Sequence, residues 1–470
     1  MSKVKNKFDM KMLGVIFALA WPTMLEQLMQ TAVQYIDTAM VGSLGTQATA
    51  AVGATTTVSW LVGSTVNAIG IGFLSFISQS IGAGDGKKAK RASAQAVFVT
   101  AAVGVIFTVL TVGLSSAVPA MMQVDESVRA LAGRYFLIVY SPMLFRAASM
   151  IFGTVLRSVG DTKTPMRIGL AVNLINVVFN FLLIYPTRSA ELLGMSFTVP
   201  GAGLGVEGAA FASAISYVFG GAAITAALFR HPLISPKGQS FKPDKEILKP
   251  CFKVAIPNMF QRFGTSFGYV AFASMINALG DVATAAHTVA NTVESAFYIP
   301  GWGMQTAAAT LAGNAAGAKE PEKLRSLSRT VTVLEVVMMF VSGALLFIFA
   351  PQLVGIFSKD KEVIGLGTTV LRMVAVSEPF YGVPIVIEGI MQGIGNTTAP
   401  LVFNITGMWL VRIAGTFICT RVLGLGLAAA WGCMIAHNLS LFFMFGIHYL
   451  RGKALACNMQ KKPGAQNAGG

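Results

Sequence analysis

A carboxylate and two amides have the types and spacing to bind a cation. Asp37 lies in a long apolar stretch, residues 12–41, and Gln34 precedes it by three residues, on roughly the same helical face. Asn176 and Asn180 are spaced i, i+4, which points two amides from one helix toward one place. Carboxylate and amide oxygens suit a hard cation such as Na⁺. A protonated Asp37 that donates to an amide oxygen suits H⁺ equally well, so both ions remain candidates.

Other charged side chains lie within apolar stretches. Glu26, Arg262 and Glu294, together with the uncharged Gln34 and Tyr381, are the candidates to contact substrate or to carry a proton. An ionisable side chain at membrane depth costs about 3 kcal/mol on insertion scales, so it is usually retained for a reason. For Glu294 the alternative is a structural salt bridge, for example with Arg262. Glu388 is expected to lie near a solvated helix end.

These residues must be positioned by helices that cross a membrane. The chain is 54% hydrophobic and only 12% charged, with a mean hydropathy of +0.66, whereas soluble domains carry roughly 25% charged residues. A span needs about 20 mostly apolar residues. The candidate spans are residues 12–41, 48–80, 90–116, 128–151, 165–185, 204–229, 249–279, 283–314, 324–350, 363–391, 400–420 and 425–450. We therefore expect an all-α polytopic membrane protein with about twelve transmembrane helices in a lipid bilayer.

The basic residues predict the orientation of these spans. With the N-terminus in the cytoplasm, 25 Lys and Arg fall on the inner side and 7 in outer loops. By the positive-inside rule, both termini are cytoplasmic and the spans lie in the inner (plasma) membrane. The net charge of +15 is thus distributed over loops rather than gathered on a soluble face, which excludes nucleic acid as a partner.

An internal repeat divides the chain into two halves. Pro257 repeats Pro22, and Gly395 repeats Gly160, at one constant offset along the chain. Six duplicated spans keep the same orientation, which predicts two six-helix lobes related by a pseudo-twofold axis along the membrane normal. The expected parts are an N-terminal lobe (1–229), a cytoplasmic linker (230–248), a C-terminal lobe (249–453) and a cytoplasmic tail (454–470). Two such lobes suit alternating access to a cleft between them.

The polar set around Asp37 does not repeat. At the same offset Asp37 corresponds to Phe272, Asn176 to Val411 and Asn180 to Gly415. Scaffold features recur in both halves, so this set is expected to serve function. The alternative is that Asp37 contacts water in the cleft and that the two amides join neighbouring helices.

Three motifs resemble one family of transporters. Residues 37–42 read DTAMVG, residues 160–165 read GDTKTP, and the repeat of the second motif at residues 395–400 reads GNTTAP. Together they resemble the multidrug and toxic compound extrusion (MATE) family over residues 10 to 450. The resemblance implies a V-shaped pair of lobes that exports amphipathic, often cationic compounds against an H⁺ or Na⁺ gradient.

The resemblance also carries site residues. It implies a cation site in the N-terminal lobe at Asp37, Asn176 and Asn180, with Ser213 at the position of a hydroxyl ligand. The NorM-type branch adds a Glu and an Asp in the other lobe. Here Arg262 lies on the first of those helices and Tyr381 stands at the second position, which puts a NorM-type site in that lobe in doubt.

Enzyme motifs are absent from the sequence. It has no P-loop, no HExxH and no GxSxG, so we expect neither an enzyme nor a nucleotide or other cofactor, only H⁺ or Na⁺ as coupling ion. The expected partner is a small organic molecule, transported by a monomer. The alternatives are a flippase or exporter of a lipid-linked or anionic metabolite, and a membrane sensor that transports nothing.

Overall fold

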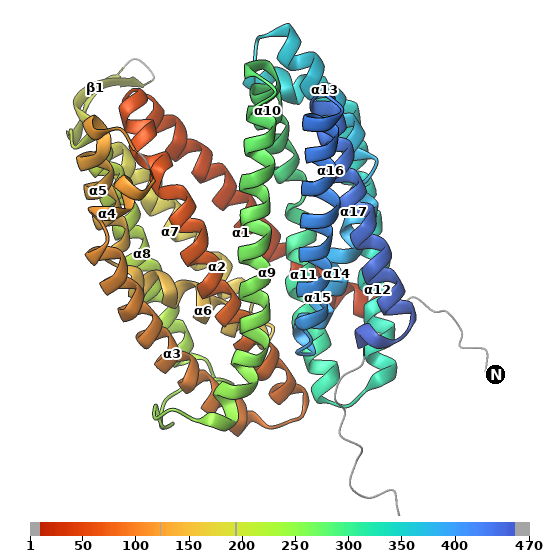
Figure 1. The fold of residues 1–470 in the computed structure, drawn as a ribbon. Helices are drawn as coiled ribbons and strands as arrows, with labels where there is room; N and C mark the ends of the chain where they lie inside the picture. The colour runs from red at the N-terminus through yellow and green to blue at the C-terminus, as the bar shows by residue number, and fades with distance from the viewer. Residues whose placement is uncertain (1–9, 123, 193–194, 456–470) are drawn as a thin grey trace, which may run out of the picture.

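The computed structural model describes residues 10–122, 124–192 and 195–455, which are almost entirely helical (Figure 1). The first half of the chain contains α1 (Met10–Gly42), α2 (Thr46–Gly82), α3 (Gly86–Gly113), α4 (Ala117–Met121), α5 (Glu126–Tyr140), α6 (Met143–Ser158), α7 (Lys163–Leu183), β1 (Pro186–Leu192), β2 (Met195–Ala202) and α8 (Gly205–Arg230). The second half contains α9 (Lys245–Asn277), α10 (Asp281–Phe297), α11 (Ile299–Gly317), α12 (Pro321–Phe357), α13 (Lys361–Ala375), α14 (Glu378–Gly393), α15 (Thr398–Thr406), η1 (Gly407–Ile413), α16 (Ala414–Phe417), η2 (Ile418–Val422), α17 (Leu427–Leu450) and η3 (Lys453–Leu455). We call α1–α8 the N lobe and α9–η3 the C lobe.

The predicted spans correspond to these helices. Within the described residues, eight helices are long and apolar enough to cross a membrane. Two further spans are bent pairs, α5 with α6 at 50° and α13 with α14 at 56°, which brings the number to ten. Helix α9 and the consecutive helices α10 and α11 occupy the two remaining predicted segments. The prediction of a helical, polytopic membrane protein is confirmed.

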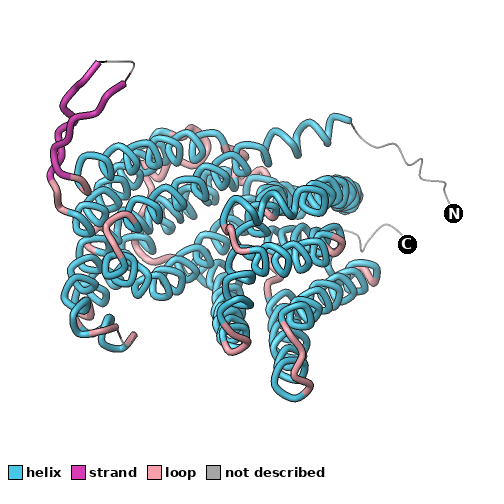
Figure 2. Tube along the Cα trace, turned by 90° about the horizontal axis from the view of Figure 1, so that it is seen from above, coloured by secondary structure: helices cyan, strands magenta, loops and turns pink. Residues whose placement is uncertain are grey.

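One element is not helical. Strands β1 and β2 pair antiparallel, with Arg188 opposite Val199, where the first half has an insertion relative to the second. Figure 2 shows this hairpin standing out beyond the helices of the N lobe. This hairpin is a local addition to the all-α fold, formed because the segment between α7 and α8 pairs with itself.

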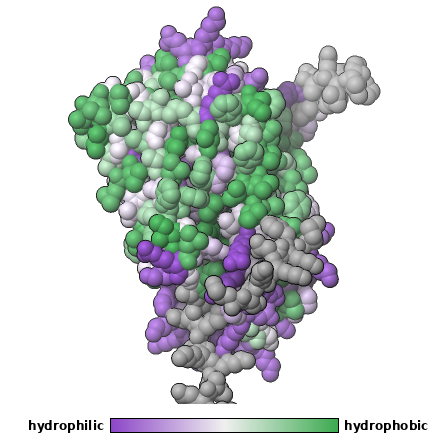
Figure 3. All heavy atoms as spheres, turned by 90° about the vertical axis from the view of Figure 1, so that its right-hand side faces the viewer, coloured by the Kyte–Doolittle hydropathy of each residue, from purple (hydrophilic) through white to green (hydrophobic). Residues whose placement is uncertain are grey.

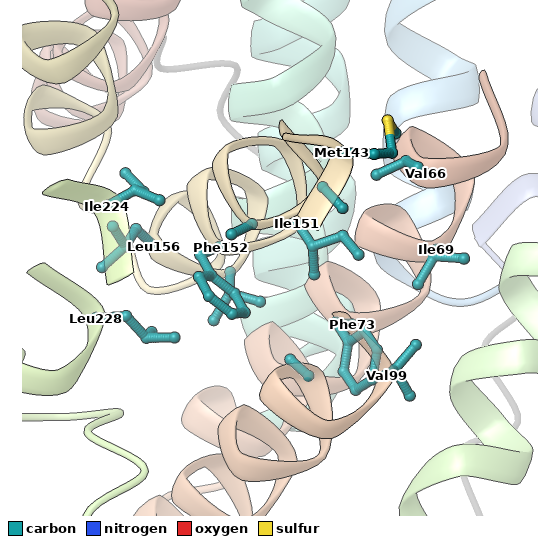
Figure 4. Close-up of a cluster of buried hydrophobic side chains, with 14 of the residues drawn as sticks. Val66, Ile69, Phe73, Val99, Met143, Ile151, Phe152, Leu156, Ile224 and Leu228 are labelled. Atoms are coloured by element: carbon teal, nitrogen blue, oxygen red, sulfur yellow. The ribbon is translucent and has the colours of Figure 1, made fainter. Parts of the chain in front are cut away.

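Each lobe has its own apolar core. In the N lobe, helices α2, α3, α6 and α8 interlock through side chains that are less than a tenth exposed (Figure 4). The residues labelled there are Val66, Ile69, Phe73, Val99, Met143, Ile151, Phe152, Leu156, Ile224 and Leu228. In the C lobe the equivalent core lies around Phe272, Leu346 and Trp431.

Helix α1 belongs to both lobes. Ile16 and Ala20 in its first half are fully buried against Met304 and Ala308 of α11. Met40 and Val41 at its other end pack on Ile184 and on α8. The first half of α1 thus packs on the C lobe, and its other end packs on the N lobe.

The internal repeat is visible in the local geometry. Asp125 and Asp360, which correspond at the offset of the repeat, each cap a helix by accepting a backbone N–H bond, at 2.9 and 2.8 Å. The bonds from Ser127 lower the pKa of Asp125. Gly160 and Gly395 both adopt φ +86°, a left-handed conformation that favours glycine in the turn after a helix. Equal backbone requirements at equivalent positions explain why these residues recur.

The backbones of the two lobes come close together where α2 crosses α11. A Cβ at Gly82 would lie 2.0 Å from the carbonyl oxygen of Asn314, and a Cβ at Gly317 would lie 1.9 Å from that of Gln79. Gly317 is the repeat equivalent of Gly82, and Asn314 that of Gln79, so the crossing has the pseudo-twofold symmetry of the repeat. We call these four residues the glycine crossing. In Figure 1 the two bundles approach at this lower end and diverge toward α10 and β1.

The surface agrees with a bilayer environment. Figure 3 shows a broad band of apolar side chains between hydrophilic upper and lower ends. Large apolar side chains such as Val109, Phe340 and Leu410 are more than three-fifths exposed. Exposed apolar area on this scale is expected where lipid chains are the solvent.

Methyl groups at the glycine crossing should separate the lobes. In the double variant Gly82→Ala and Gly317→Ala, each new Cβ meets a backbone oxygen that cannot rotate away. We expect spin labels at positions 87 and 323, in the exposed first turns of α3 and α12 beside the crossing, to move apart by a few ångström in double electron–electron resonance. Gly86→Ala is the control, because a Cβ there meets nothing within 4 Å. Unchanged distances in the double variant would contradict the role given to the crossing.

Candidate functional site

The structure brings the predicted cation-site residues of the N lobe together. Asp37 on α1 faces α7, where the Asn180 Nδ2 donates to Asp37 Oδ1 at 2.5 Å and lies 3.1 Å from Asn176 Oδ1. Ser213 on α8 completes the group, since its Oγ lies 3.4 Å from the Asn176 amide. Asn176 and Asn180 are 7% and 1% exposed, so the amides contact the carboxylate away from bulk water. We call these four residues the Asp37 cluster.

The Asn176 amide can present either its oxygen or its nitrogen to Asp37, and the two orientations suit different protonation states of the carboxyl. Its terminal atom nearest to Asp37 lies 2.9 and 3.1 Å from the two carboxylate oxygens. As a nitrogen, this atom donates to an ionised carboxylate; as an oxygen, it needs a shared proton or cation between the two groups. Asn180 Oδ1 is buried without a partner, which leaves another oxygen for an ion. The cluster therefore offers ligands for Na⁺ and an acceptor for a proton on Asp37.

Helix geometry explains why the cluster forms. The i, i+4 spacing of Asn176 and Asn180 puts both amides on one face of α7, and this face packs on α1 and α8. Gln34 lies one turn before Asp37, but its side chain is exposed and is not part of the cluster. The grouping of Asp37, Asn176, Asn180 and Ser213 was predictable; the exposure of Gln34 was not.

The equivalent place in the C lobe is built differently. Phe272, which corresponds to Asp37, is 1% exposed. The guanidinium of Arg412 lies 4.1 Å from its ring centroid. A carboxylate among amides in one lobe thus corresponds to an aromatic ring under an arginine in the other.

Glu294 and Tyr381 lie close together in the C lobe. Glu294 is 2% exposed and accepts a hydrogen bond from the Tyr298 hydroxyl one turn later on the chain. Tyr381 packs edge-on against Tyr298 at 5.2 Å between ring centroids. The salt bridge considered between Glu294 and Arg262 is not formed, because Arg262 instead donates from Nε to Asn258 Oδ1 at 3.0 Å.

Two acids that the sequence analysis did not select lie near Glu294. Glu335 on α12 and Glu378 on α14 are 0% and 1% exposed, and none of their four carboxyl oxygens has a hydrogen-bond partner. Glu378 interacts electrostatically with both Glu294 and Glu335. Burial without partners strongly disfavours ionised carboxylates. Each interrupts an apolar run, and that signal could have identified them.

Two other acids have ordinary partners. Glu26 forms an ion pair with Arg157 at 2.6 Å, which gives it a structural partner within the N lobe. Glu388 accepts bonds from three side-chain amides, Gln261 at 2.9 Å, Gln392 at 3.0 Å and Asn404 at 3.1 Å. Glu388 is half-buried, and amides from α9, α14 and α15 bind its carboxylate, so it is more than a solvated helix-end residue. Gln261 and Gln392 are the repeat equivalents of Glu26 and Arg157, so the same two positions form polar contacts in both lobes.

These features define a class of protein. Duplicated bundles of membrane-spanning helices, joined at a narrow crossing and carrying buried ionisable groups in each lobe, are typical of a transporter. The sequence profile of the MatE family matches residues 22–182 and 257–418, once in each half. The chain therefore belongs to the MatE family, the multidrug and toxic compound extrusion transporters, and is not an enzyme.

Individual relatives agree with this assignment. The chain is 28% identical to the "Probable multidrug resistance protein NorM" of Thermotoga maritima over 93% of this chain and 92% of that protein. It is 27% identical to the "Probable multidrug resistance protein YoeA" of Bacillus subtilis, over 91% of each. The fold matches the "outward-facing conformation of a multidrug resistance MATE family transporter" with a TM-score of 0.85 at 23% identity, covering 94% of this chain and 96% of the other.

The network around Glu388 should contribute to stability. In Glu388→Gln, one acceptor oxygen becomes an NH₂ group that faces the N–H of a neighbouring amide. An unpaired buried donor costs about 1–3 kcal/mol, so we expect a lower midpoint of thermal unfolding for the purified protein. Glu322→Gln is the control, because that carboxylate is exposed and lies 3.7 Å from Arg325. Equal midpoints for the two variants would show that the amides do not depend on the charge of Glu388.

Proposed function

We propose that this protein exports amphipathic, cationic organic compounds in exchange for H⁺ or Na⁺, by alternating access between its two lobes. The observation that carries the proposal is the Asp37 cluster, a carboxylate held by buried amides in one lobe with no counterpart in the other. A residue set that the repeat does not preserve is not required by the scaffold. Burying an ionisable group in a membrane protein is costly, and coupling to an ion is a reason to retain it.

Asp37 is the coupling residue in this proposal. For H⁺, the carboxyl takes up a proton and becomes neutral, and the Asn176 amide accepts the hydrogen bond from it. For Na⁺, the ligands are the side-chain oxygens of Asp37, Asn176 and Asn180, and the Ser213 hydroxyl is a fourth oxygen ligand. In either case, occupation neutralises the carboxylate of Asp37, which changes the interaction of α1 with α7 and with a cationic substrate.

The substrate occupies the space between the lobes. Tyr35, two residues before Asp37, donates to the Thr292 carbonyl oxygen of α10 at 3.2 Å, so α1 reaches the C lobe beside the Asp37 cluster. A cation entering here is attracted by Asp37 and competes with the coupling ion for its charge. Such competition links export to uptake of the ion.

Several observations beyond this chain support the proposal. The relatives in Thermotoga maritima and Bacillus subtilis are described as multidrug resistance proteins. A transporter of the same fold has been crystallised in complex with MaD3S, with a TM-score of 0.85. A NorM-type cation site in the C lobe is not part of the proposal, because Arg262 and Tyr381 offer no carboxylate there.

The distribution of basic residues supports placement in the plasma membrane. Lys87, Lys88 and Lys90 follow the glycine crossing directly, and Lys323 lies at the equivalent place in the second half. We propose that this end, with both termini, faces the cytoplasm. The lobes then diverge toward the outside, and the protein acts as a monomer.

Efflux measurements test the coupling residue. In everted vesicles, with pH and Na⁺ gradients imposed separately, we expect a gradient to drive accumulation of a fluorescent organic cation by the unmodified protein. Asp37→Asn keeps the size of the side chain but cannot ionise, so gradient-driven transport should fall at least tenfold at unchanged expression. Asp281→Asn, at an exposed position of α10, should transport normally. Normal transport by Asp37→Asn would remove the mechanism.

Substitution of the Asn176 amide distinguishes Na⁺ from H⁺ as the coupling ion. Na⁺ requires several oxygen ligands, whereas a proton requires only the carboxyl and one acceptor. If Na⁺ drives transport, Asn176→Ala should raise the Na⁺ concentration for half-maximal efflux at least tenfold. A proton-driven carrier should instead retain most of its pH-driven efflux in Asn176→Ala. The same vesicles with Asn438→Ala, in the C lobe, provide the control.

A further inference from the structure

An arginine lies inside the C lobe without an acidic partner. Arg412 is 3% exposed, and its guanidinium packs over the rings of Phe272 and Tyr269, at 4.1 and 4.9 Å. Nη2 approaches only the sulfur of Met434 at 3.0 Å, and Nε has no partner. None of the ion pairs among the described residues includes this guanidinium. A buried charge normally needs a counter-charge and hydrogen bonds.

Other polar groups without partners surround this arginine. Trp431 is fully buried and its Nε1 donates to nothing. His437 is 4% exposed and neither ring nitrogen has a partner. The Thr416 hydroxyl, one helical turn after Arg412, is fully buried and has only the thiol of Cys433 beside it. The guanidinium, indole, imidazole and hydroxyl groups all offer N–H or O–H donors, and buried donors are rarely left unpaired.

These groups lie where η1 and α16 pack on α17. Arg412 and Thr416 lie on η1 and α16, and these segments pack against α17, which carries Trp431, Met434 and His437. The rings of Phe272, His287 and Trp431 are linked in turn, with centroids 5.6 and 5.9 Å apart. We call Arg412, Thr416, Trp431 and His437 the Arg412 cluster. Its backbone is locally π-helical over Gly407–Ile413, a distortion that is frequent at functional sites.

The chemistry of the cluster selects the charge of its ligand. A cation is repelled by the guanidinium and finds few acceptors. A small anion is attracted by the charge and accepts bonds from the unpaired N–H and O–H groups. We propose that the Arg412 cluster binds a small monovalent anion, either a halide or a carboxylate group, inside the C lobe.

Glu294 is the internal competitor for this role. It interacts electrostatically with Arg412. However, the two side chains form no ion pair within 4.0 Å, and the Glu294 carboxylate is bonded to Tyr298. Glu294 also shares its surroundings with Glu335 and Glu378, so added negative charge there is costly. An exogenous anion neutralises Arg412 without placing a second charge among these acids.

The N lobe supplies a contrast. Arg146 on α6 lies between the rings of Tyr140 and Tyr217, at 5.5 and 5.1 Å, and is hydrogen-bonded to Tyr140. Its surroundings therefore provide aromatic faces and an acceptor. Arg146→Gln removes the same charge as Arg412→Gln from a place with no group of unpaired donors, which makes it the matched control.

Anion binding can be measured as a gain in thermal stability. The purified full-length protein in sodium gluconate is titrated with chloride, bromide or acetate at constant ionic strength. At about a hundredfold excess over the dissociation constant, the unfolding midpoint should rise by about 3 °C. Chloride and bromide acting alone identify a halide site, whereas an equal effect of acetate identifies a site for carboxylate groups. Absence of any anion effect on the unmodified protein overturns the proposal.

The variants locate the effect. Arg412→Gln should lose the anion response, and Arg146→Gln should keep it. A full response in Arg412→Gln overturns the assignment. If Arg412→Gln does not fold, diffraction from bromide-soaked crystals of the unmodified protein decides the question. An anomalous peak within hydrogen-bond distance of Arg412 Nε supports the site, and a cluster without a peak overturns it. Equal loss of stability in Glu294→Gln, with no anion effect, would identify Glu294 as the counter-charge.

Discussion

The close approach of α2 and α11 is the constraint on which the rest of the architecture depends. Two helix backbones can touch here only because Gly82 and Gly317 place no side chain between them and the facing carbonyl oxygens. In a membrane, lipid offers little hydrophobic drive for helices to associate, so packing of small residues determines where lobes join. The crossing closes one end of the molecule. It leaves the opposite end free to diverge, and α1 runs from the C lobe past the crossing to the Asp37 cluster.

The repeat preserves the scaffold and varies the chemistry. Turn glycines, helix caps and crossing glycines recur because each lobe needs the same backbone path. Buried polar groups do not recur in kind: the ion pair of Glu26 and Arg157 becomes two glutamines that bind Glu388. Asp37 likewise becomes Phe272, under Arg412. The interiors of the two lobes thus differ in charge although their folds match.

Much of the candidate site was predictable from residue spacing and family resemblance. Asn176 and Asn180 were expected on one face, and together with Asp37 and Ser213 they do contact one another. The prediction was less successful for the C lobe. Glu335 and Glu378 were overlooked, and the three amides that bind Glu388 were not foreseen. Helical periodicity places side chains on a face, but it does not show which other helix that face meets.

The sequence by itself determined the helices, the duplication and the membrane environment. Length of apolar runs, scarcity of charge and a constant offset between repeated residues are properties of the chain alone. Only the tertiary structure decided which buried polar groups have partners. Arg157 is 131 residues from Glu26, and Asn180 is 143 residues from Asp37. The packing of helices that are far apart in the sequence sets the distances between side chains and their exposure to solvent. These decide whether a charged side chain forms a structural ion pair, as Glu26 does, or has no acidic partner, as for Arg412.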